Sequence, residues 1–312
     1  MKRLLYSHRS DIDGMGSVIL SKIAFDEIDY TLCKNIADLS DTLKEDYETG
    51  KLYEYDTIYI TDLSPRKELL EQILNDGKLK GKVYLFDHHE TAYNSGYNDL
   101  ENVTVIVQNE EGKKCATQIY YEFLLDVGFL NNTKAAEQFV ELVRREDIYE
   151  WKKYNDMKAH DLAILFNEIG IEKYIETMTK KLAEKPDSDF EFSEEEQEAI
   201  SHKKKVTLAN VQNFVSKLKV INVDGFKAGV CFIIYEYRNE VAEYLMEKNE
   251  FDLDCVAMFA FENNQISLRS IKDNSSARIV AEKYGGGGHD KAAAIPITDE
   301  MRSKIIGSVF NN

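Results

Sequence analysis

Three short segments of the sequence carry carboxylate and imidazole side chains, each directly after an apolar stretch. The candidates in "SHRSDIDG", "TDLS" and "FDHHET" are His8, Asp11, Asp13, Asp62, Asp87, His88 and His89. A fourth segment, "RREDIYEW", adds Asp147, where the neighbouring Glu146 could take the same role. Carboxylates crowded together repel one another unless cations compensate them, so the set predicts a metal site.

The mixture of imidazole and carboxylate groups indicates which chemistry such a site would perform. These donors suit Mn²⁺ and similar borderline metals. The set is too large for one ion, whereas two ions ~3.5–4 Å apart and bridged by a carboxylate would use all of it. Such a pair lowers the pKa of a bound water towards ~7 and stabilises the attacking and leaving oxygens of a phosphoryl displacement.

The elements that must position these groups alternate between strand and helix over residues 1–110. Strands are expected at 3–7, 29–33, 56–61, 82–86 and 103–107, and helices at 14–27, 36–47 and 65–75. This alternation predicts βαβ units and an α/β domain with a parallel sheet. Ligands bind such sheets at the carboxyl ends of the strands, and the candidate residues follow three of these strands.

Each candidate also has a purely structural explanation. Asp62 could cap the helix expected near Pro65, with Pro65 in its first turn, and Asp87 could cap the turn after its strand. Of the adjacent histidines, one could be a core residue and the other exposed. The recurrence of the same side-chain types at three strand ends favours the metal site.

The second half of the chain predicts a helical region, a connector and another α/β domain. Residues 115–183 are expected to be helical, and Ser193 with Glu196 has the spacing of a capping box at a helix start. Strands are expected at 219–223, 227–234, 254–261 and 265–270, and helices near 238–248, 275–284 and 299–310. The predicted organisation is a catalytic domain at 1–185, a helical linker at 186–218 and a smaller α/β domain at 219–312.

A glycine-rich segment, "EKYGGGGHDKAAA", is the strongest signal in the second domain. Four consecutive glycines allow backbone amides to approach an anion closely, and His289 follows them directly; a flexible loop is the equal alternative. Arg269, at the end of the strand in "ISLRS", suits bidentate contact with a phosphate. Arg278 lies in an expected helix and is interpreted as a surface or packing residue.

Charge and composition limit the classes of function. The chain has 39 basic and 56 acidic residues, a formal net charge of −17, which argues against binding of long nucleic acid but not of a small anion. The four cysteines form no Cys-x-x-Cys pair, which indicates reduced thiols. The apolar stretch at the N-terminus is too short for a signal peptide, and no apolar run approaches the ~18 residues of a membrane span. A cytoplasmic protein is expected.

These segments together resemble the DHH phosphoesterase superfamily, which is named for the triplet that stands here as Asp87-His88-His89. The segments "SHRSDIDG", "TDLS" and "FDHHET" resemble its first three motifs, and Asp147 is the best candidate for the fourth. The segments "ISLRS" and "GGGGHDKAAA" resemble the companion DHHA1 substrate domain. The resemblance covers almost the whole chain. Within the superfamily, the sequence is most similar to the nanoRNase B branch of oligoribonucleases.

The resemblance implies a two-metal centre, usually Mn²⁺, with Mg²⁺ or Co²⁺ as alternatives. It implies one metal held by His8, Asp11 and Asp62, and a second held by Asp13, Asp62, His88 and Asp147. It further implies that Asp87 orients a ligand, that His89 steadies the scissile phosphate, and that a terminal phosphate or the nucleotide is bound by Arg269, Gly287, Gly288 and His289. The sequence departs from the pattern of the family at two points. Only two residues separate His8 from Asp11, where many relatives have three, and Ala294 stands where the second-domain motif commonly has glycine.

The activity implied is metal-dependent hydrolysis of short oligoribonucleotides to 5′-mononucleotides, with 3′-phosphoadenosine 5′-phosphate as a side substrate. Hydrolysis of cyclic or linear dinucleotides is the nearest alternative, and an inactive nucleotide-binding sensor is an alternative of another class. An inorganic pyrophosphatase is disfavoured, because that branch has a different second domain without the glycine–histidine loop. The expected partners are short RNA or small nucleotides, not membranes, and a homodimer is left open.

Overall fold

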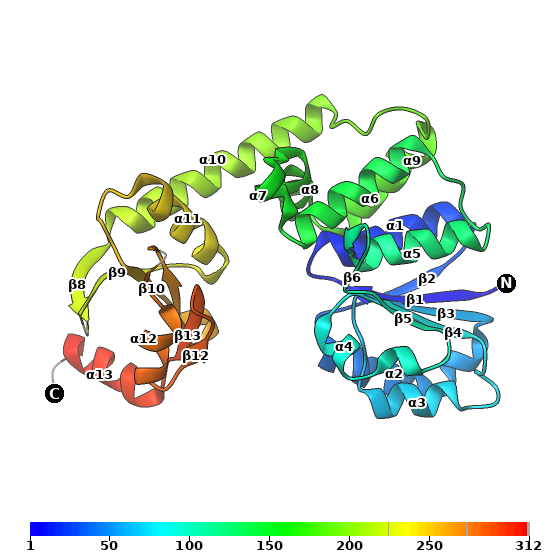
Figure 1. Ribbon diagram of the computed structural model, residues 1–312, viewed down its shortest axis with the longest axis horizontal. Coiled ribbons are helices and arrows are strands. Elements are labelled where there is room, and N and C mark those ends of the chain that lie inside the picture. The colour runs from blue at the N-terminus through cyan, green and yellow to red at the C-terminus, as the bar shows by residue number, and fades with distance from the viewer. Residues whose placement is uncertain (224, 273, 311–312) are drawn as a thin grey trace. The chain divides into compact units, whose positions relative to one another are not determined.

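The chain forms two compact units, Met1–Ser201 and His202–Asn312 (Figure 1). The computed structural model describes residues 1–223, 225–272 and 274–310. Helix α10 (Glu194–Ser216) spans the division between the units and lies inside the segment predicted as the linker. Its start is a capping box: the Glu196 amide donates to Ser193 Oγ at 3.3 Å, and the Ser193 amide donates to Glu196 Oε2 at 2.7 Å. The predicted domain limits at 185 and 218 stay a prediction.

The first unit is built on a five-stranded parallel sheet with the order β2-β1-β3-β4-β5. Its strands are β1 (Arg3–His8), β2 (Asp29–Cys33), β3 (Thr57–Thr61), β4 (Val83–Asp87) and β5 (Val103–Val105). The central strands read as continuous apolar runs because both faces of the sheet are covered by helices. The prediction of a parallel α/β sheet is confirmed, and β1, β3 and β4 are immediate neighbours.

Two hydrophobic cores lie on opposite faces of this sheet. Leu5, Tyr59 and Phe86 lie on one face, in a core that also contains residues of α1 (Ile12–Ala24), α5 (Ala116–Asp126), α6 (Lys134–Asp147), α8 (Met157–Ile169) and α9 (Ile171–Glu184) (Figure 1). Leu4 and Ile58, which alternate with them, pack on the other face against α2 (Ile36–Glu48) and α3 (Lys67–Leu74). The shorter elements are η1 (Lys51–Glu54), α4 (Glu90–Asn94), η2 (Tyr97–Asp99), β6 (Gln108–Asn109), β7 (Gly112–Lys113) and α7 (Glu150–Tyr154).

The start of α3 differs from its prediction. The helix begins at Lys67 with Arg66 as its N-cap, so Pro65 lies before the helix and not in its first turn. The Pro65 carbonyl accepts a hydrogen bond from Tyr97 Oη at 2.6 Å, and the Arg66 amide donates to Ser40 Oγ at 3.0 Å. These tertiary contacts hold the segment after β3 outside the helix, so α3 begins only at Lys67.

The second unit contains a mixed six-stranded sheet with the order β12-β13-β11-β10-β9-β8. Its elements are β8 (Lys219–Val223), β9 (Phe226–Phe232), η3 (Tyr235–Tyr237), α11 (Arg238–Lys248), β10 (Cys255–Ala260), η4 (Phe261–Asn263), β11 (Gln265–Ser270), α12 (Ala277–Lys283), β12 (Gly287–Gly288), β13 (Ala292–Pro296) and α13 (Asp299–Phe310). Strands β9 and β10 pair in parallel, and the other neighbouring pairs are antiparallel. The second α/β domain is confirmed, whereas β12 and β13 were not predicted.

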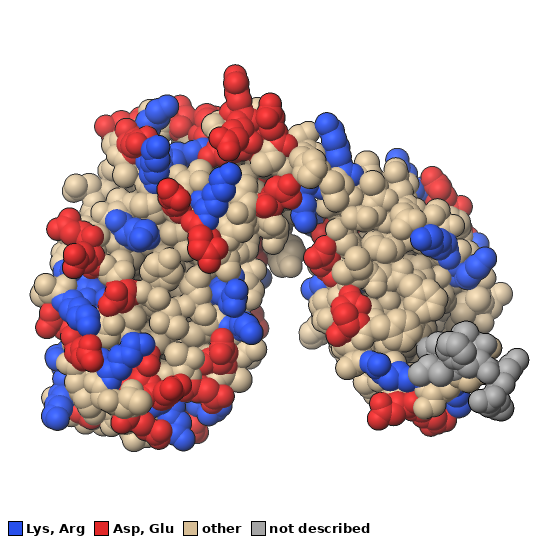
Figure 2. All heavy atoms as spheres, turned by 180° about the vertical axis from the view of Figure 1, so that it is seen from behind, with Lys and Arg blue, Asp and Glu red and all other residues tan. Residues whose placement is uncertain are grey.

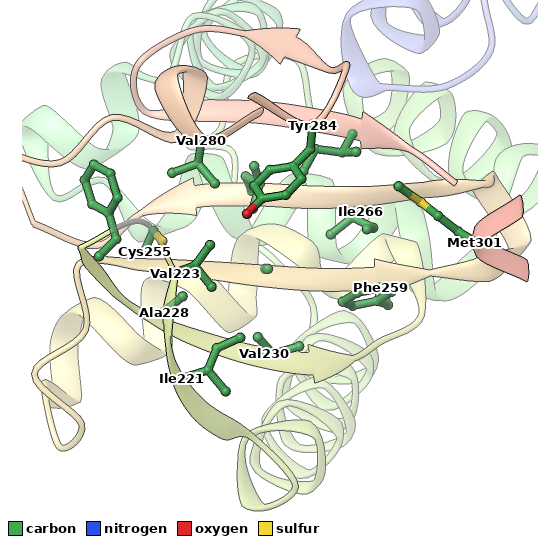
Figure 3. Close-up of a pocket in the computed structure, with 14 residues that line it drawn as sticks. Ile221, Val223, Ala228, Val230, Cys255, Phe259, Ile266, Val280, Tyr284 and Met301 are labelled. Atoms are coloured by element: carbon green, nitrogen blue, oxygen red, sulfur yellow. The ribbon is translucent and has the colours of Figure 1, made fainter. Parts of the chain in front are cut away.

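An apolar cavity of about 230 Å³ lies against one face of the second sheet. Val280 and Tyr284 approach it from the α12 segment and Met301 from α13, over strand residues such as Ile221 and Val230 (Figure 3). Its lining is almost entirely hydrocarbon, and the described residues that line it include no charged side chain for a phosphate.

The described part of the chain contains no helix with the length and apolar character needed to cross a membrane. Cys33, Cys115, Cys231 and Cys255 are all free thiols and all buried, as the scattered cysteine pattern predicted.

Candidate metal centre

Neighbouring elements of the first unit end at the same edge of its sheet and carry the candidate residues there. His8 is the last residue of β1, Asp62 directly follows β3, and Asp87 is the last residue of β4. The other candidates come from the start of α1, the segment after β4 and the last residue of α6, and are Asp11, Asp13, His88, His89 and Asp147. The order β1-β3-β4 makes these strand ends converge.

His8, Asp11 and Asp62 form the first group of polar atoms within reach of one cation. His8 Nδ1 lies 2.7 Å from Asp11 Oδ2 and 3.3 Å from Asp62 Oδ2. The two-residue spacing between His8 and Asp11 therefore still brings their side chains into contact.

Asp13, His88 and Asp147 form the second group. His88 Nε2 lies 3.7 Å from Asp13 Oδ2, 3.4 Å from Asp147 Oδ2 and 3.5 Å from Asp62 Oδ1. Asp62 thus directs Oδ2 to the first group and Oδ1 to the second. Glu146 turns elsewhere, to Nδ1 of His160 at 3.3 Å, so Asp147 is the acidic residue of the fourth segment that joins the cluster.

The backbone of Asp62 is unusual for a residue with a side chain. Its φ is +62°, in the left-handed region that favours glycine. Its amide donates to the Phe86 carbonyl at 3.0 Å, which ties the strained residue to β4. Such conformations cost about 1–3 kcal/mol and persist where the surrounding structure imposes them, often at functional sites. The left-handed backbone therefore lowers the stability of the fold at the position where this carboxylate lies between the two groups.

Three buried atoms of the cluster, Asp62 Oδ2, His88 Nε2 and Asp147 Oδ2, have no hydrogen-bond partner within the described part of the chain. Buried polar groups are normally paired, since an unpaired one costs about 1–3 kcal/mol. Asp62 Oδ2 lies in the first group, and His88 Nε2 and Asp147 Oδ2 lie in the second. Their carboxylate and imidazole chemistry is that of a divalent metal site. The residues present fit a metal centre.

Burial and mutual repulsion change the protonation of this cluster. Burial raises the pKa of Asp62 to about 7, and the nearby charges of Asp13 and Asp11 add to this. Burial likewise raises the pKa of Asp147 to about 9, with Asp13 as the next contribution. Burial opposes charging of His8 and His88, but the surrounding carboxylates outweigh it and raise the pKa of each to about 10. In the absence of cations, the raised pKa values mean that these carboxyl and imidazole groups hold protons, which reduce the repulsion between the carboxylates.

Asp87 orients its neighbours in the triplet. Its Oδ1 accepts the amides of His88 at 2.7 Å and His89 at 3.1 Å and lies 2.7 Å from His89 Nδ1, while Oδ2 accepts Ser64 Oγ at 2.5 Å. Burial alone would raise the pKa of Asp87, but the hydrogen bonds from His89 and Ser64 lower it. Nδ1 of His89 is thus engaged, which leaves Nε2 of this half-exposed side chain for another ligand. Ser64 was missed from the sequence, and its only signal is its place in "TDLS".

The candidate substrate residues of the second unit lie close together on its sheet. Arg269 of β11 pairs with Ala292 of β13, and Gly288 of β12 pairs with Ala293. One Arg269 nitrogen donates to Asn239 Oδ1 at 3.0 Å. His289 follows Gly287 and Gly288 and closes a tight turn, in which its amide donates to the Ala292 carbonyl at 2.8 Å.

Two residues of the glycine segment, Gly287 and Gly288, form strand β12, which pairs with β13 in a hairpin. Gly288 has a φ of +139°, and a Cβ at this position would lie 2.6 Å from Ala293 Cα, so only glycine fits. Ala294, which stands where relatives commonly have glycine, pairs regularly with Ser267 and Gly287. This departure leaves the ladder of hydrogen bonds intact. Arg278, predicted as a surface or packing residue, is half exposed and contacts Asp290 at 3.1 Å.

Comparison with known proteins agrees with this architecture. Oligoribonuclease NrnB of Bacillus subtilis is 32% identical in an alignment that covers 98% of this chain and 75% of the relative. The pGpG-specific phosphodiesterase PggH of Vibrio cholerae has a similar structure, with a TM-score of 0.56, 16% identity and coverage of 99% and 97% of the two chains. Manganese-bound RecJ of Thermus thermophilus has a TM-score of 0.58, 12% identity and coverage of 99% and 51%.

The two solved structures share the fold at low identity, and the sequence matches no protein-family profile. The identity with NrnB, which extends over nearly the whole chain, carries the assignment. The chain belongs to the DHH/DHHA1 phosphoesterase superfamily, as a phosphoric-ester hydrolase related to NrnB.

Proposed function

We propose that this protein is a metal-dependent phosphodiesterase that hydrolyses short oligoribonucleotides to 5′-mononucleotides. The single observation that carries the proposal is the position of Asp62, whose two carboxylate oxygens face two separate groups of imidazole and carboxylate atoms. This arrangement suits two cations bridged by one carboxylate. His8 and Asp11 would complete one site, and the other would be completed by Asp13, His88 and Asp147.

When bound, two divalent ions, Mn²⁺ on the basis of the mixed donors, would lower the pKa of a water and compensate the charge of the phosphate. The protein holds the reacting groups through neighbours that fix each side chain. Asp87 keeps Nδ1 of His89 engaged, so His89 Nε2 is the atom proposed to donate to a phosphate oxygen. Burial of Asp13, Asp62 and Asp87, each at most 2% exposed, excludes water that would compete for their oxygens.

The second unit supplies the proposed anion-binding groups. Arg269 and the exposed hairpin formed by Gly287, Gly288 and His289 would hold a phosphate that is not cleaved, with the guanidinium of Arg269 supplying charge-assisted hydrogen bonds. On the face drawn in Figure 2, Lys and Arg side chains of the first unit are interspersed with Asp and Glu rather than gathered into a track. Together with the net charge of −17, this favours short substrates over long strands.

Product analysis tests the proposal. The protein is freed of metal, reloaded with Mn²⁺, and incubated with a 5′-labelled RNA dinucleotide, an RNA pentanucleotide, a cyclic dinucleotide and 3′-phosphoadenosine 5′-phosphate. We expect Mn²⁺-dependent release of 5′-mononucleotides from the linear RNAs, with slower hydrolysis of 3′-phosphoadenosine 5′-phosphate. Faster turnover of the cyclic dinucleotide would assign the alternative substrate class. Binding without turnover would indicate a sensor, and full activity of His88→Ala would rule out the proposed centre.

A further inference from the structure

The first turn of α5 meets the carboxylate of Asp13, although the two lie 103 residues apart in sequence. The Ala116 amide donates to Asp13 Oδ2 at 2.8 Å, and the Thr117 amide donates to Asp13 Oδ1 at 2.7 Å. Among the described residues, Cys115, the N-cap of α5, makes no capping hydrogen bond through its side chain. Asp13, located in the first turn of α1, therefore caps a different helix.

This cap fixes the orientation of a proposed metal ligand. Each oxygen of Asp13 accepts one backbone amide, which sets the plane of the carboxylate and leaves a lone pair on each oxygen for a cation. Asp13 is fully buried, so water cannot replace a lost amide. The N-terminus of a helix also stabilises a negative charge placed against it. The amides of α5 thus hold the carboxylate of Asp13 in place, with His88 Nε2 3.7 Å from its Oδ2.

Gly16 and Thr117 set how closely the two helices approach. Thr117 Oγ1 donates to the backbone carbonyl of Asp13 at 2.5 Å. A Cβ at Gly16 would lie 2.4 Å from Thr117 Oγ1 and 2.7 Å from Thr117 Cγ2. Glycine in a helix interior costs about 0.5–1 kcal/mol relative to alanine, and this contact explains its presence at position 16. Any larger residue would push the first turn of α5 away from Asp13.

The segment before α5 is anchored as well. Lys114 is 2% exposed, and its Nζ lies 2.7 Å from both Glu111 and Glu122. The Lys113 carbonyl accepts a hydrogen bond from Arg144 at 3.1 Å, and Arg144 belongs to α6, the helix that ends at Asp147. The start of α5 is therefore tied to the helix that carries another residue of the cluster.

We propose that Gly16 and Thr117 are positioning residues of the metal centre. They hold the first turn of α5 against Asp13, so that its carboxylate presents fixed oxygens to the cation beside His88. This inference rests on the two-metal function proposed above. The contact made by these two residues is expected to change the affinity for the metal separately from the overall stability of the protein.

The test compares Gly16→Ala and Thr117→Val with Thr117→Ser, which keeps the hydroxyl, and with Gly77→Ala as a matched control. A Cβ at Gly77 would meet no described atom within 4 Å. Mn²⁺ binding is measured by isothermal titration calorimetry, the electron paramagnetic resonance of bound Mn²⁺ is recorded, and thermal unfolding is followed without metal. We expect Gly16→Ala and Thr117→Val to weaken Mn²⁺ binding about tenfold, the lower end of effects seen when partners of metal ligands are changed. Thr117→Ser and Gly77→Ala should bind as the wild type does.

The possible outcomes separate this inference from the proposed function. Wild-type protein that binds no Mn²⁺ would overturn both. Wild-type protein that binds Mn²⁺, with Gly16→Ala and Thr117→Val less stable but equal to it in affinity and resonance spectrum, would overturn the positioning role alone. If Gly16→Ala does not fold, the comparison of Thr117→Val with Thr117→Ser decides, since these two differ in the hydroxyl that contacts Asp13.

Discussion

The candidate metal centre of the first unit and the candidate phosphate site of the second are built in opposite ways. At the metal centre three of the carboxylates are buried side chains: Asp13, Asp62 and Asp87 are 0%, 2% and 1% exposed. In the second unit Gly287, Gly288 and His289 are exposed, and the site consists largely of backbone. Chemistry at phosphorus needs fixed charges in a dry environment, whereas recognition of an anion tolerates water and a simple hairpin.

The comparison predicts that changes in the first region lower kcat most. Asp62→Ala should remove the carboxylate shared by both proposed cations. The loss of several kcal/mol of charge stabilisation corresponds to a fall in kcat of at least about 10³-fold. Steady-state hydrolysis of an RNA dinucleotide and the stoichiometry of bound Mn²⁺ measure the effect. Asp41→Ala, which removes an exposed aspartate paired with Arg66, is the control. Normal Mn²⁺ stoichiometry in Asp62→Ala would contradict the bridging role.

Changes in the second region should act on KM instead. Arg269→Ala removes a charge-assisted contact worth about 1.5–3 kcal/mol, which corresponds to a rise in KM of about 10–100-fold with little change in kcat. The comparison variant is Arg278→Ala, because Arg278 is a half-exposed arginine on α12 that pairs with Asp290. Equal effects of the two substitutions on KM would remove Arg269 from the phosphate site.

The two regions should also differ in pH dependence, since the buried cluster holds protons that a metal must displace. The pKa of Asp62 is raised from 3.8 to about 7 and that of Asp147 from 3.8 to about 9. Between these ordinary and raised values, the metal-free folded state binds more protons than the unfolded chain. Its stability therefore falls as pH rises from about 4 towards 9, whereas Mn²⁺ affinity increases, by about tenfold per pH unit for each proton released. Calorimetry and thermal unfolding with and without Mn²⁺ from about pH 6 to 9 measure both trends. An affinity independent of pH would contradict the protonated cluster.

The smallest effect is expected where a buried neighbour only orients a reacting group. Ser64→Ala leaves the Oδ2 atom of buried Asp87 without the Ser64 hydroxyl. Loss of this support should lower kcat about tenfold, with Mn²⁺ stoichiometry unchanged. Ser64→Thr, which keeps a hydroxyl, is the matched variant and should recover part of kcat. A Ser64→Ala enzyme with wild-type kcat would show that Asp87 holds His89 without this hydrogen bond.

The parallel sheet and the residues at its edge were predictable because one rule links strand order to location. His8, Asp62 and Asp87 each end or follow a strand, and the carboxyl ends of parallel strands share an edge. The sequence favoured Asp147 through the family resemblance but left Glu146 open. Both lie in the last turn of α6, and packing alone decides which one faces His88.

Other features carry no periodic signal in the sequence. Strands β12 and β13 consist largely of glycine and alanine, residues depleted in strands, and they exist because β11 pairs with β13. The capping of α5 by Asp13 depends on a tertiary contact between distant segments, and no local pattern marks Ser64 or Thr117 as partners of the cluster. Sequence reasoning finds residues by type and element, and misses those that act through a neighbour.

The left-handed backbone at Asp62 lies at the residue proposed to bridge the two cations, so stability and the proposed catalysis are opposed at a single position. Asp62→Gly would relax the strained peptide and remove a buried carboxyl group, so the apo-enzyme should melt at a higher temperature while losing turnover. Heat-resistant variants selected by random mutagenesis without an activity screen should therefore include inactive enzymes that are altered at this position.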